Sequence, residues 1–133
     1  MEPRMENGAR TRDLDRKETG SLIGSDKVEG TSVYGLGEDK IGKIERIMID
    51  KQSGKVAYAV LSFGGFLGIG DEHYPIPWGK LTYDEGLGGY RTDISKDTLE
   101  GAPRYRSDDD FDWENREASL GVYNHYGMPP YWI

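Results

Sequence analysis

The sequence predicts a mainly β fold, a small β-barrel followed by a C-terminal helical and aromatic extension. Two neighbouring runs, residues 41–49 and 55–63, are rich in the β-branched and aromatic side chains typical of strands. The 19 glycines among 133 residues provide many tight turns. Several further short apolar runs follow at close spacing, and this pattern favours a small barrel of strongly coiled strands.

The two long runs predict a β-hairpin, because only the short polar segment 50–54 separates them and it ends in glycine. Strict alternation fails in the first run, where Ile44 and Ile47 are three residues apart and Ile47 and Ile49 are two apart. One extra residue in the strand accounts for both spacings. We therefore expect a β-bulge near Glu45–Arg46, the device that bends a sheet toward closure.

The second run is apolar on both faces. One face carries Val56, Tyr58 and Val60, and the other carries Ala57, Ala59, Leu61 and Phe63. A strand of this kind has to be covered on both sides. One face suits a barrel interior, so the other must meet either the C-terminal segment or a second subunit.

Four shorter strands are expected at residues 32–34, 73–76, 81–83 and 90–92, separated by turns that contain glycine or aspartate. Pro75 and Pro77 lack N–H donors, which places the 73–76 strand at an edge of the sheet or keeps it very short. Ser95 is a typical N-cap residue, and it predicts a brief helix over 96–100 that ends at Gly101 and Pro103.

Composition divides the chain into three parts. Residues 1–20 hold five acidic and five basic residues with almost nothing apolar, so we expect a mostly disordered N-terminal arm. Residues 21–103 carry the β signals. Residues 104–133 form an acidic extension that contains seven of the fifteen aromatic residues. A helix is expected there over about 112–126, begun by Asp108–Asp110 and ended by Gly127.

The β-rich part is similar to the PRC-barrel family. The likeness covers residues 21–103 and rests on motifs that recur in order: 28–34 (VEGTSVY), 42–45 (GKIE), 49–50 (ID), 54–68 (GKVAYAVLSFGGFLG), 75–78 (PIPW) and 81–83 (LTY). The family includes the photosynthetic reaction centre H subunit, the C-terminal domain of a ribosome maturation factor and short stand-alone bacterial proteins. The ending 126–132 (YGMPPYW) resembles the stand-alone bacterial form.

This resemblance implies a six-stranded PRC-type β-barrel that makes protein–protein or ribonucleoprotein contacts and has no shared catalytic residues. No membrane span and no preceding barrel are evident in the chain, so neither the reaction-centre role nor the ribosome role is expected to transfer directly.

Other chemistry finds little support in the sequence. There is no cysteine, and the two histidines, His73 and His125, have no metal-ligand spacing. The glycines of 64–70 do not follow a dinucleotide-binding pattern and are followed by Asp71 and Glu72, which would repel phosphate. With a net charge of −7, we expect no direct binding of nucleic acid. We expect no enzyme activity, no cofactor, no metal, and a cytoplasmic location, since neither a signal peptide nor a membrane span is evident.

The expected function is a non-catalytic protein–protein interaction module that self-associates as a homodimer and also binds a protein client that the sequence does not identify. Phe66, Leu67 and Ile69 either plug the barrel end or form a contact surface, and the tail 129–133 either docks on its own barrel or reaches a neighbour. The alternatives are a ribonucleoprotein accessory factor and a small-molecule binder at the barrel mouth near His73. The expected interaction surface consists of Tyr58, Phe63, Phe66, Leu67, Ile69, Trp78, Tyr131 and Trp132.

Overall fold

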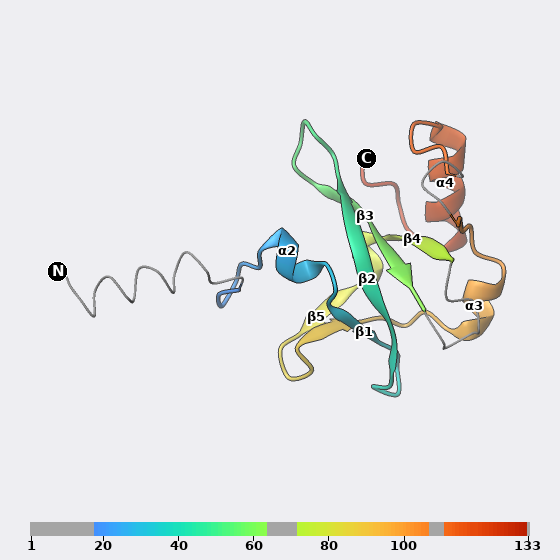
Figure 1. Ribbon diagram of the computed structural model, residues 1–133. Coiled ribbons are helices and arrows are strands. Elements are labelled where there is room, and N and C mark those ends of the chain that lie inside the picture. The colour runs from blue at the N-terminus through green and yellow to red at the C-terminus, as the bar shows by residue number, and fades with distance from the viewer. Residues whose placement is uncertain (1–17, 64–71, 107–110, 133) are drawn as a thin grey trace, which may run out of the picture.

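A single six-stranded sheet forms the centre of the molecule (Figure 1). The structure is a computed structural model and describes residues 18–63, 72–106 and 111–132. The strand order is β4-β3-β2-β1-β6-β5. In chain order the strands are β1 (Ser32–Tyr34), β2 (Lys40–Ile49), β3 (Val56–Ser62), β4 (His73–Pro77), β5 (Thr82–Asp84) and β6 (Gly89–Arg91). All six expected strands are thus confirmed, with bounds that differ by one residue at most.

The β2–β3 hairpin is confirmed, and its turn shows why this sequence closes it. The Asp50 carboxylate accepts hydrogen bonds from the N–H groups of Gln52 and Ser53, both at 2.9 Å. Gly54 then adopts a φ of 78°, a conformation that other residues rarely reach. The predicted bulge is also present, because the register between β2 and β3 shifts between Ile44 and Arg46.

The sheet is not closed into a barrel by a ladder between its two edge strands, β4 and β5, in the described part of the chain. The expectation of a closed barrel therefore holds only as far as a mainly β, six-stranded sheet. Its neighbouring strands pair antiparallel except β1 and β6, which pair in parallel through Val33 with Tyr90 and Tyr34 with Arg91. A 3-10 turn, η1 (Trp78–Lys80), connects the two edge strands.

The proline chemistry of β4 gives a reason for this open edge. The N–H of His73 donates to the carbonyl of Tyr105 at 2.8 Å, on the side away from β3. In an antiparallel strand, the backbone N–H positions of the residues two and four places later point to the same side as the N–H of His73. These are Pro75 and Pro77, which have no N–H, so the edge cannot continue a ladder. The predicted edge position of this strand is confirmed.

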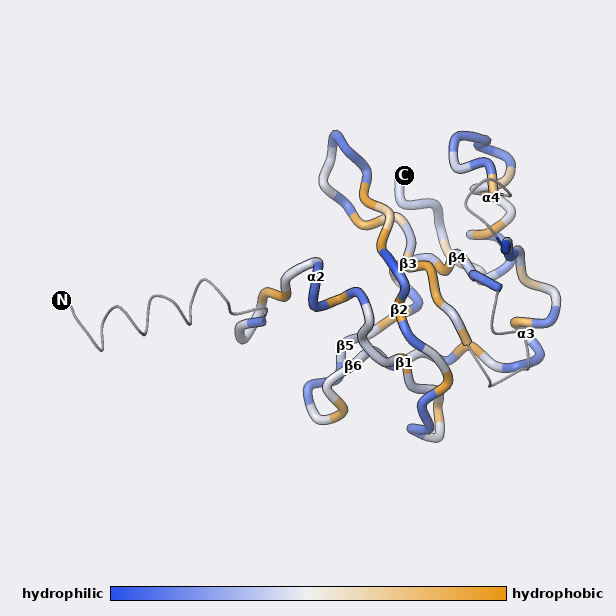
Figure 2. Tube along the Cα trace, in the orientation of Figure 1, coloured by the Kyte–Doolittle hydropathy of each residue, from blue (hydrophilic) through white to orange (hydrophobic). Residues whose placement is uncertain are grey.

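Residues of high hydropathy are concentrated along β3, whereas the turn between β2 and β3 is hydrophilic (Figure 2). On the interior face of the sheet the fully buried side chains include Ile44, Leu61, Tyr74 and Ile76. Val33 from β1 is also fully buried. Tyr90 from β6 is buried as well, so the core draws on five strands.

The helices follow their capping residues. In α3 (Lys96–Glu100) the predicted cap is confirmed, because the Ser95 hydroxyl accepts from the N–H of Thr98 at 3.2 Å. The second predicted helix exists as α4 (Arg116–His125) and begins about four residues later than expected. The reason is Asn115, whose side chain accepts from the N–H groups of residues 117 and 118. Gly127, at φ 67°, follows its end as predicted.

A short helix, α2 (Ser25–Val28), and η1 were not anticipated. Three expectations fall outside the described residues: the disorder of most of the arm, in residues 1–17, the role of the glycine-rich loop 64–71, and a helix start at Asp108–Asp110. No helix in the described ranges combines the length and apolarity that crossing a bilayer requires.

Candidate interaction surfaces

The C-terminal extension covers the outer face of β3, the second apolar face noted in the sequence. The ring of Tyr58 contacts Trp113 and Tyr123, with centroid distances of 5.5 and 5.2 Å. The Tyr123 hydroxyl also donates to the Ala57 carbonyl oxygen at 2.7 Å. Of the two expected covers, a C-terminal segment or a second subunit, the chain supplies the first. The packing requirement of β3 is therefore met within one molecule.

The tail docks on its own chain. The Tyr131 hydroxyl donates to Asp50 Oδ2 at 3.0 Å, which ties the tail to the turn of the β2–β3 hairpin. The pKa of Asp50 is lowered, first by the Ser53 N–H and then by the Tyr131 hydroxyl. The Arg116 guanidinium lies 3.8 Å from the centroid of the Trp132 ring. Tyr58, Tyr131 and Trp132 are thus brought together, as parts of an intramolecular cluster.

A hollow of about 260 Å³ lies within this cluster, lined by Tyr58, Tyr131, Trp132 and their neighbours on the extension. Among the described residues the buried Tyr58 hydroxyl has no hydrogen-bond partner there. Burial raises the pKa of Tyr58, and the Ser119 side chain offsets part of that rise.

Phe63 lies in the core and not on the surface. Its side chain is fully buried and packs edge-on against Tyr74, with a centroid distance of 5.2 Å. It therefore has no exposed area to offer a partner. Phe66, Leu67 and Ile69 fall outside the described residues, and their role stays a prediction.

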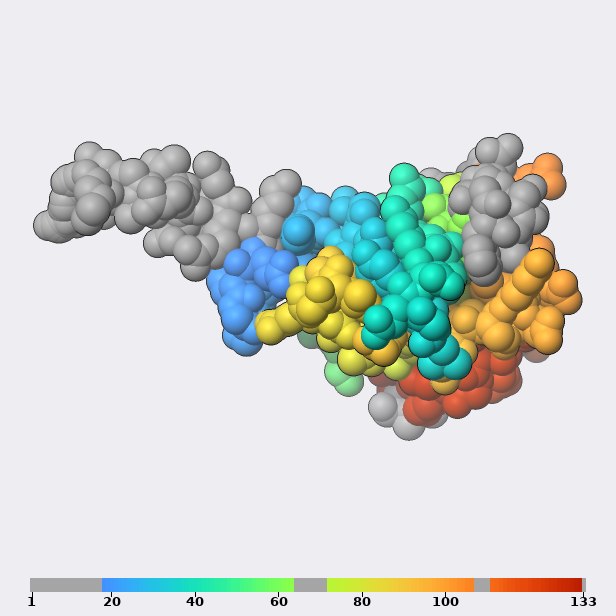
Figure 3. Space-filling view, turned by 90° about the horizontal axis from the view of Figure 1, so that it is seen from below, coloured from blue at the N-terminus to red at the C-terminus, as the bar shows by residue number. Residues whose placement is uncertain are grey.

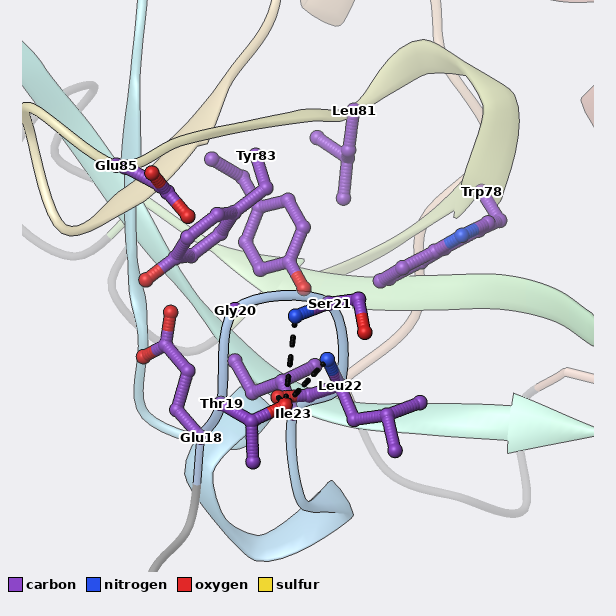
Figure 4. Close-up of a pocket in the computed structure, with 11 residues that line it drawn as sticks. Glu18, Thr19, Gly20, Ser21, Leu22, Ile23, Trp78, Leu81, Tyr83 and Glu85 are labelled. Atoms are coloured by element: carbon purple, nitrogen blue, oxygen red, sulfur yellow. Dashed lines mark hydrogen bonds between the residues drawn. The ribbon is translucent and has the colours of Figure 1, made fainter.

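Trp78 lies in a second place, a pocket of about 300 Å³ between residues 18–23 and the β5–β6 side of the sheet (Figure 4). In the space-filling view the blue segment that begins at residue 18 lies beside the yellow β5–β6 hairpin, at the opposite end of the molecule from α4 (Figure 3). A tight turn builds this wall: the Thr19 hydroxyl accepts from the Leu22 N–H at 2.9 Å, and the Thr19 N–H donates to the Leu22 carbonyl. We call the hollow the barrel-end pocket; it is lined by residues 18–23, Trp78, Leu81, Tyr83, Glu85 and Tyr90.

Three aromatic rings line the barrel-end pocket. Tyr90 is buried and lies between the other two, with centroid distances of 5.3 Å to Trp78 and 5.1 Å to Tyr83. Two carboxylates, Glu18 and Glu85, lie on the Tyr83 side. Hydrogen bonding to Glu18 is the main cause that raises the pKa of Tyr83 to about 12. Leu22, which is 72% exposed, stands at the rim.

Both histidines have structural partners. The ring of His73 lies 5.3 Å from that of Tyr105, and His125 Nε2 lies 2.7 Å from the Thr98 carbonyl oxygen. Neither lines the barrel-end pocket, and binding of a small molecule at a barrel mouth near His73 stays a prediction. Within the described ranges no group of three metal-ligating side chains comes together.

Most of the barrel-end pocket was missed by reasoning from sequence. The sequence predicts a surface role for Trp78, whereas it places Tyr83 and Tyr90 only in strands. Their place at either end of a glycine-rich turn was the available signal, because antiparallel pairing brings Tyr83 opposite Tyr90. Glu18 gave no signal, since it belonged to a segment read as disordered.

The comparisons with known proteins bear on the barrel part of the chain. The PRC-barrel domain profile matches residues 21–99, more than half of the sequence. The chain belongs to the PRC-barrel family. The PRC-barrel domain is a non-catalytic kind of module. The match begins within the turn that walls the barrel-end pocket and stops before α4, so the extension that covers β3 lies outside it.

A curated relative of this PRC-barrel chain is an uncharacterized protein of Deinococcus radiodurans. The two are 25% identical over 93 residues, which are 70% of this chain and 33% of the relative. The matched region thus spans about a third of the relative's length.

Proposed function

We propose that this PRC-barrel chain is a non-catalytic module that binds a protein partner through the barrel-end pocket. The observation that carries the proposal is an open pocket of about 300 Å³ with three aromatic rings in its wall and the exposed Leu22 at its rim. Aromatic side chains in partly open pockets are typical anchors of protein interfaces. The outer face of β3, by contrast, is already occupied by the chain's own extension.

Two leucines of equal exposure provide a matched test. Leu22 at the pocket rim is 72% exposed, and Leu36 in the β1–β2 turn is 74% exposed and does not line this pocket. Proteins captured from native cells by the tagged chain are identified by mass spectrometry, and binding is then measured with the purified partner. We expect Leu22→Asp to abolish binding and Leu36→Asp to retain it. Equal binding by both variants would contradict the proposal.

Self-association as a homodimer remains a separate prediction. Of the features that motivate it, the outer face of β3 and the aromatic tail are packed within the chain, whereas Phe66, Leu67 and Ile69 lie outside the described residues. The dimer is therefore tested independently of the pocket. Light scattering over a range of concentrations measures the assembly state directly. A ribonucleoprotein role likewise stays a prediction, to be tested by co-sedimentation with ribosomal particles.

A further inference from the structure

The barrel-end pocket combines aromatic walls with negative charge. Trp78 and Tyr83 are half-buried and Tyr90 is 3% exposed, so two rings form walls and the third lies deepest. The electron-rich face of an aromatic ring attracts a cation, most strongly for tryptophan. Leu81 and Ile23 complete an apolar lining beneath the rim. Such a lining accommodates the hydrocarbon stem of a long side chain.

The charged groups of the pocket all have one sign. Glu18 and Glu85 are its only ionisable side chains apart from the tyrosines, and its lining holds no lysine, arginine or histidine among the described residues. Figure 4 shows both carboxylates on the same side of the pocket, near Tyr83. A hydrogen bond to Glu18 is the main cause that raises the pKa of Tyr83; burial comes second, and the charges of Glu18 and of Glu85 contribute less. An anionic ligand would be repelled here, and a cation would gain Coulomb energy.

The size of the pocket limits what enters it. Pockets for drug-sized ligands run from about 300 to 1,000 Å³, so a volume of about 300 Å³ suits a single extended side chain better than a large molecule. A divalent metal finds no support here, because among the described residues no three metal-ligating side chains come together.

We infer that the barrel-end pocket binds a basic side chain, lysine or arginine, of the partner protein, with the stem against the aromatic rings and the cation beside Glu18 and Glu85. This inference rests on the proposed function and names the chemistry of the partner. The partner's contact segment is therefore basic, which agrees in sign with the net charge of −7 on this chain.

The test uses small probes and the full chain. Nuclear magnetic resonance resolves the indole N–H signals of the three tryptophans, and the Trp78→Phe variant assigns the signal of Trp78. N-acetyl-lysine amide and N-acetyl-arginine amide are titrated against N-acetyl-norleucine amide, which has a comparable stem and no charge. We expect the two cationic probes to shift the Trp78 signal at millimolar concentration and norleucine to bind at least about fivefold more weakly.

Charge variants distinguish a local effect of the Glu18 and Glu85 carboxylates from the general effect of the chain's negative charge. The double variant Glu18→Gln/Glu85→Gln should weaken lysine binding about three- to tenfold. The control Glu45→Gln/Glu117→Gln removes the same charge at two exposed sites elsewhere, and it should leave binding within about twofold. Equal binding of norleucine and lysine, or equal loss in both double variants, would overturn the inference.

Two further outcomes are distinguishable. The arm 1–17 contains five basic residues, so a variant with all five replaced by serine is titrated in parallel. If only that variant binds the probes, the pocket belongs to the chain's own arm and the inference of a partner side chain is overturned. If the probes bind but Leu22→Asp captures the same proteins as wild type, the proposed function fails and cation recognition stands. If Leu22→Asp loses the captured proteins but the probes do not bind, the proposed function stands and only the inference of cation recognition fails.

Discussion

The hydrogen bond from Tyr123 to Ala57 offers a direct test of how the extension is held on the sheet. Tyr123→Phe removes one hydroxyl and keeps the ring, including its contact with Tyr58. The hydroxyl lies 2.7 Å from the Ala57 carbonyl oxygen, with Tyr123 2% and Ala57 5% exposed. Water cannot readily replace the lost donor at that burial, so an acceptor site is left empty.

The expected cost follows from that geometry. An unsatisfied buried acceptor costs about 1–3 kcal/mol, and a carbonyl has two lone pairs, so the lower half of the range applies. We expect Tyr123→Phe to lower the free energy of unfolding by about 1–2 kcal/mol. For a chain of this length that corresponds to a drop in Tm of about 4–7 °C. Urea unfolding followed by circular dichroism measures the difference.

Tyr58→Phe is the matched control for this prediction. It removes a hydroxyl that is similarly buried but has no hydrogen-bond partner in the part of the chain that the structure describes. The loss should change the free energy of unfolding by less than about 0.5 kcal/mol, or increase it. A larger cost for Tyr58→Phe than for Tyr123→Phe would show that the extension is not held by the contact described.

Three other variants test the local structure, each by urea unfolding. Gly42→Ala should destabilise by about 1–3 kcal/mol, because an added Cβ overlaps the Ser62 carbonyl oxygen; a neutral result would contradict the close packing of β2 on β3. Asn115→Ala should cost about 1 kcal/mol by removing the cap of α4, whereas Asn115→Asp should preserve it. Asp84→Asn tests the pH dependence of stability. A hydrogen bond from Arg91 lowers the pKa of Asp84 in the folded chain. The stability that the Asp84 carboxylate adds is therefore fully present above the ordinary carboxyl pKa of about 4 and is lost as the pH falls through the lower folded pKa. The gap between wild type and Asp84→Asn should therefore be constant at neutral pH and narrow in acid, and a gap that widens in acid would reverse the assignment.

The strands and the first capped helix could be predicted because their signals are local. Gly54 sets the hairpin turn, the spacing of Ile44 and Ile47 reveals the bulge, and Ser95 marks the start of α3. The start of α4 was placed too early because Asp108–Asp110 is a typical acidic helix start, while Asn115 makes the actual cap.

The barrel-end pocket could not be predicted because its walls are distant in sequence. Glu18 and Tyr83 are brought together by the way residues 18–23 fold back on the sheet, a packing result that no periodicity encodes. The sequence predicts that the second apolar face of β3 must be covered, but it leaves open whether the C-terminal segment or a second subunit covers it. The contact of Tyr58 with Tyr123 decides that question within the chain.

The parallel pairing of β1 with β6 has a consequence for how the protein is made on the ribosome. Val33 emerges early, yet its partner Tyr90 is synthesised 57 residues later. Until then β1 can pair only with β2, and one of its edges stays unsatisfied. Contacts of such wide separation slow folding and lengthen the time that a nascent chain is exposed to aggregation. The last strand of the sheet thus sets the earliest moment at which the whole sheet can assemble during translation.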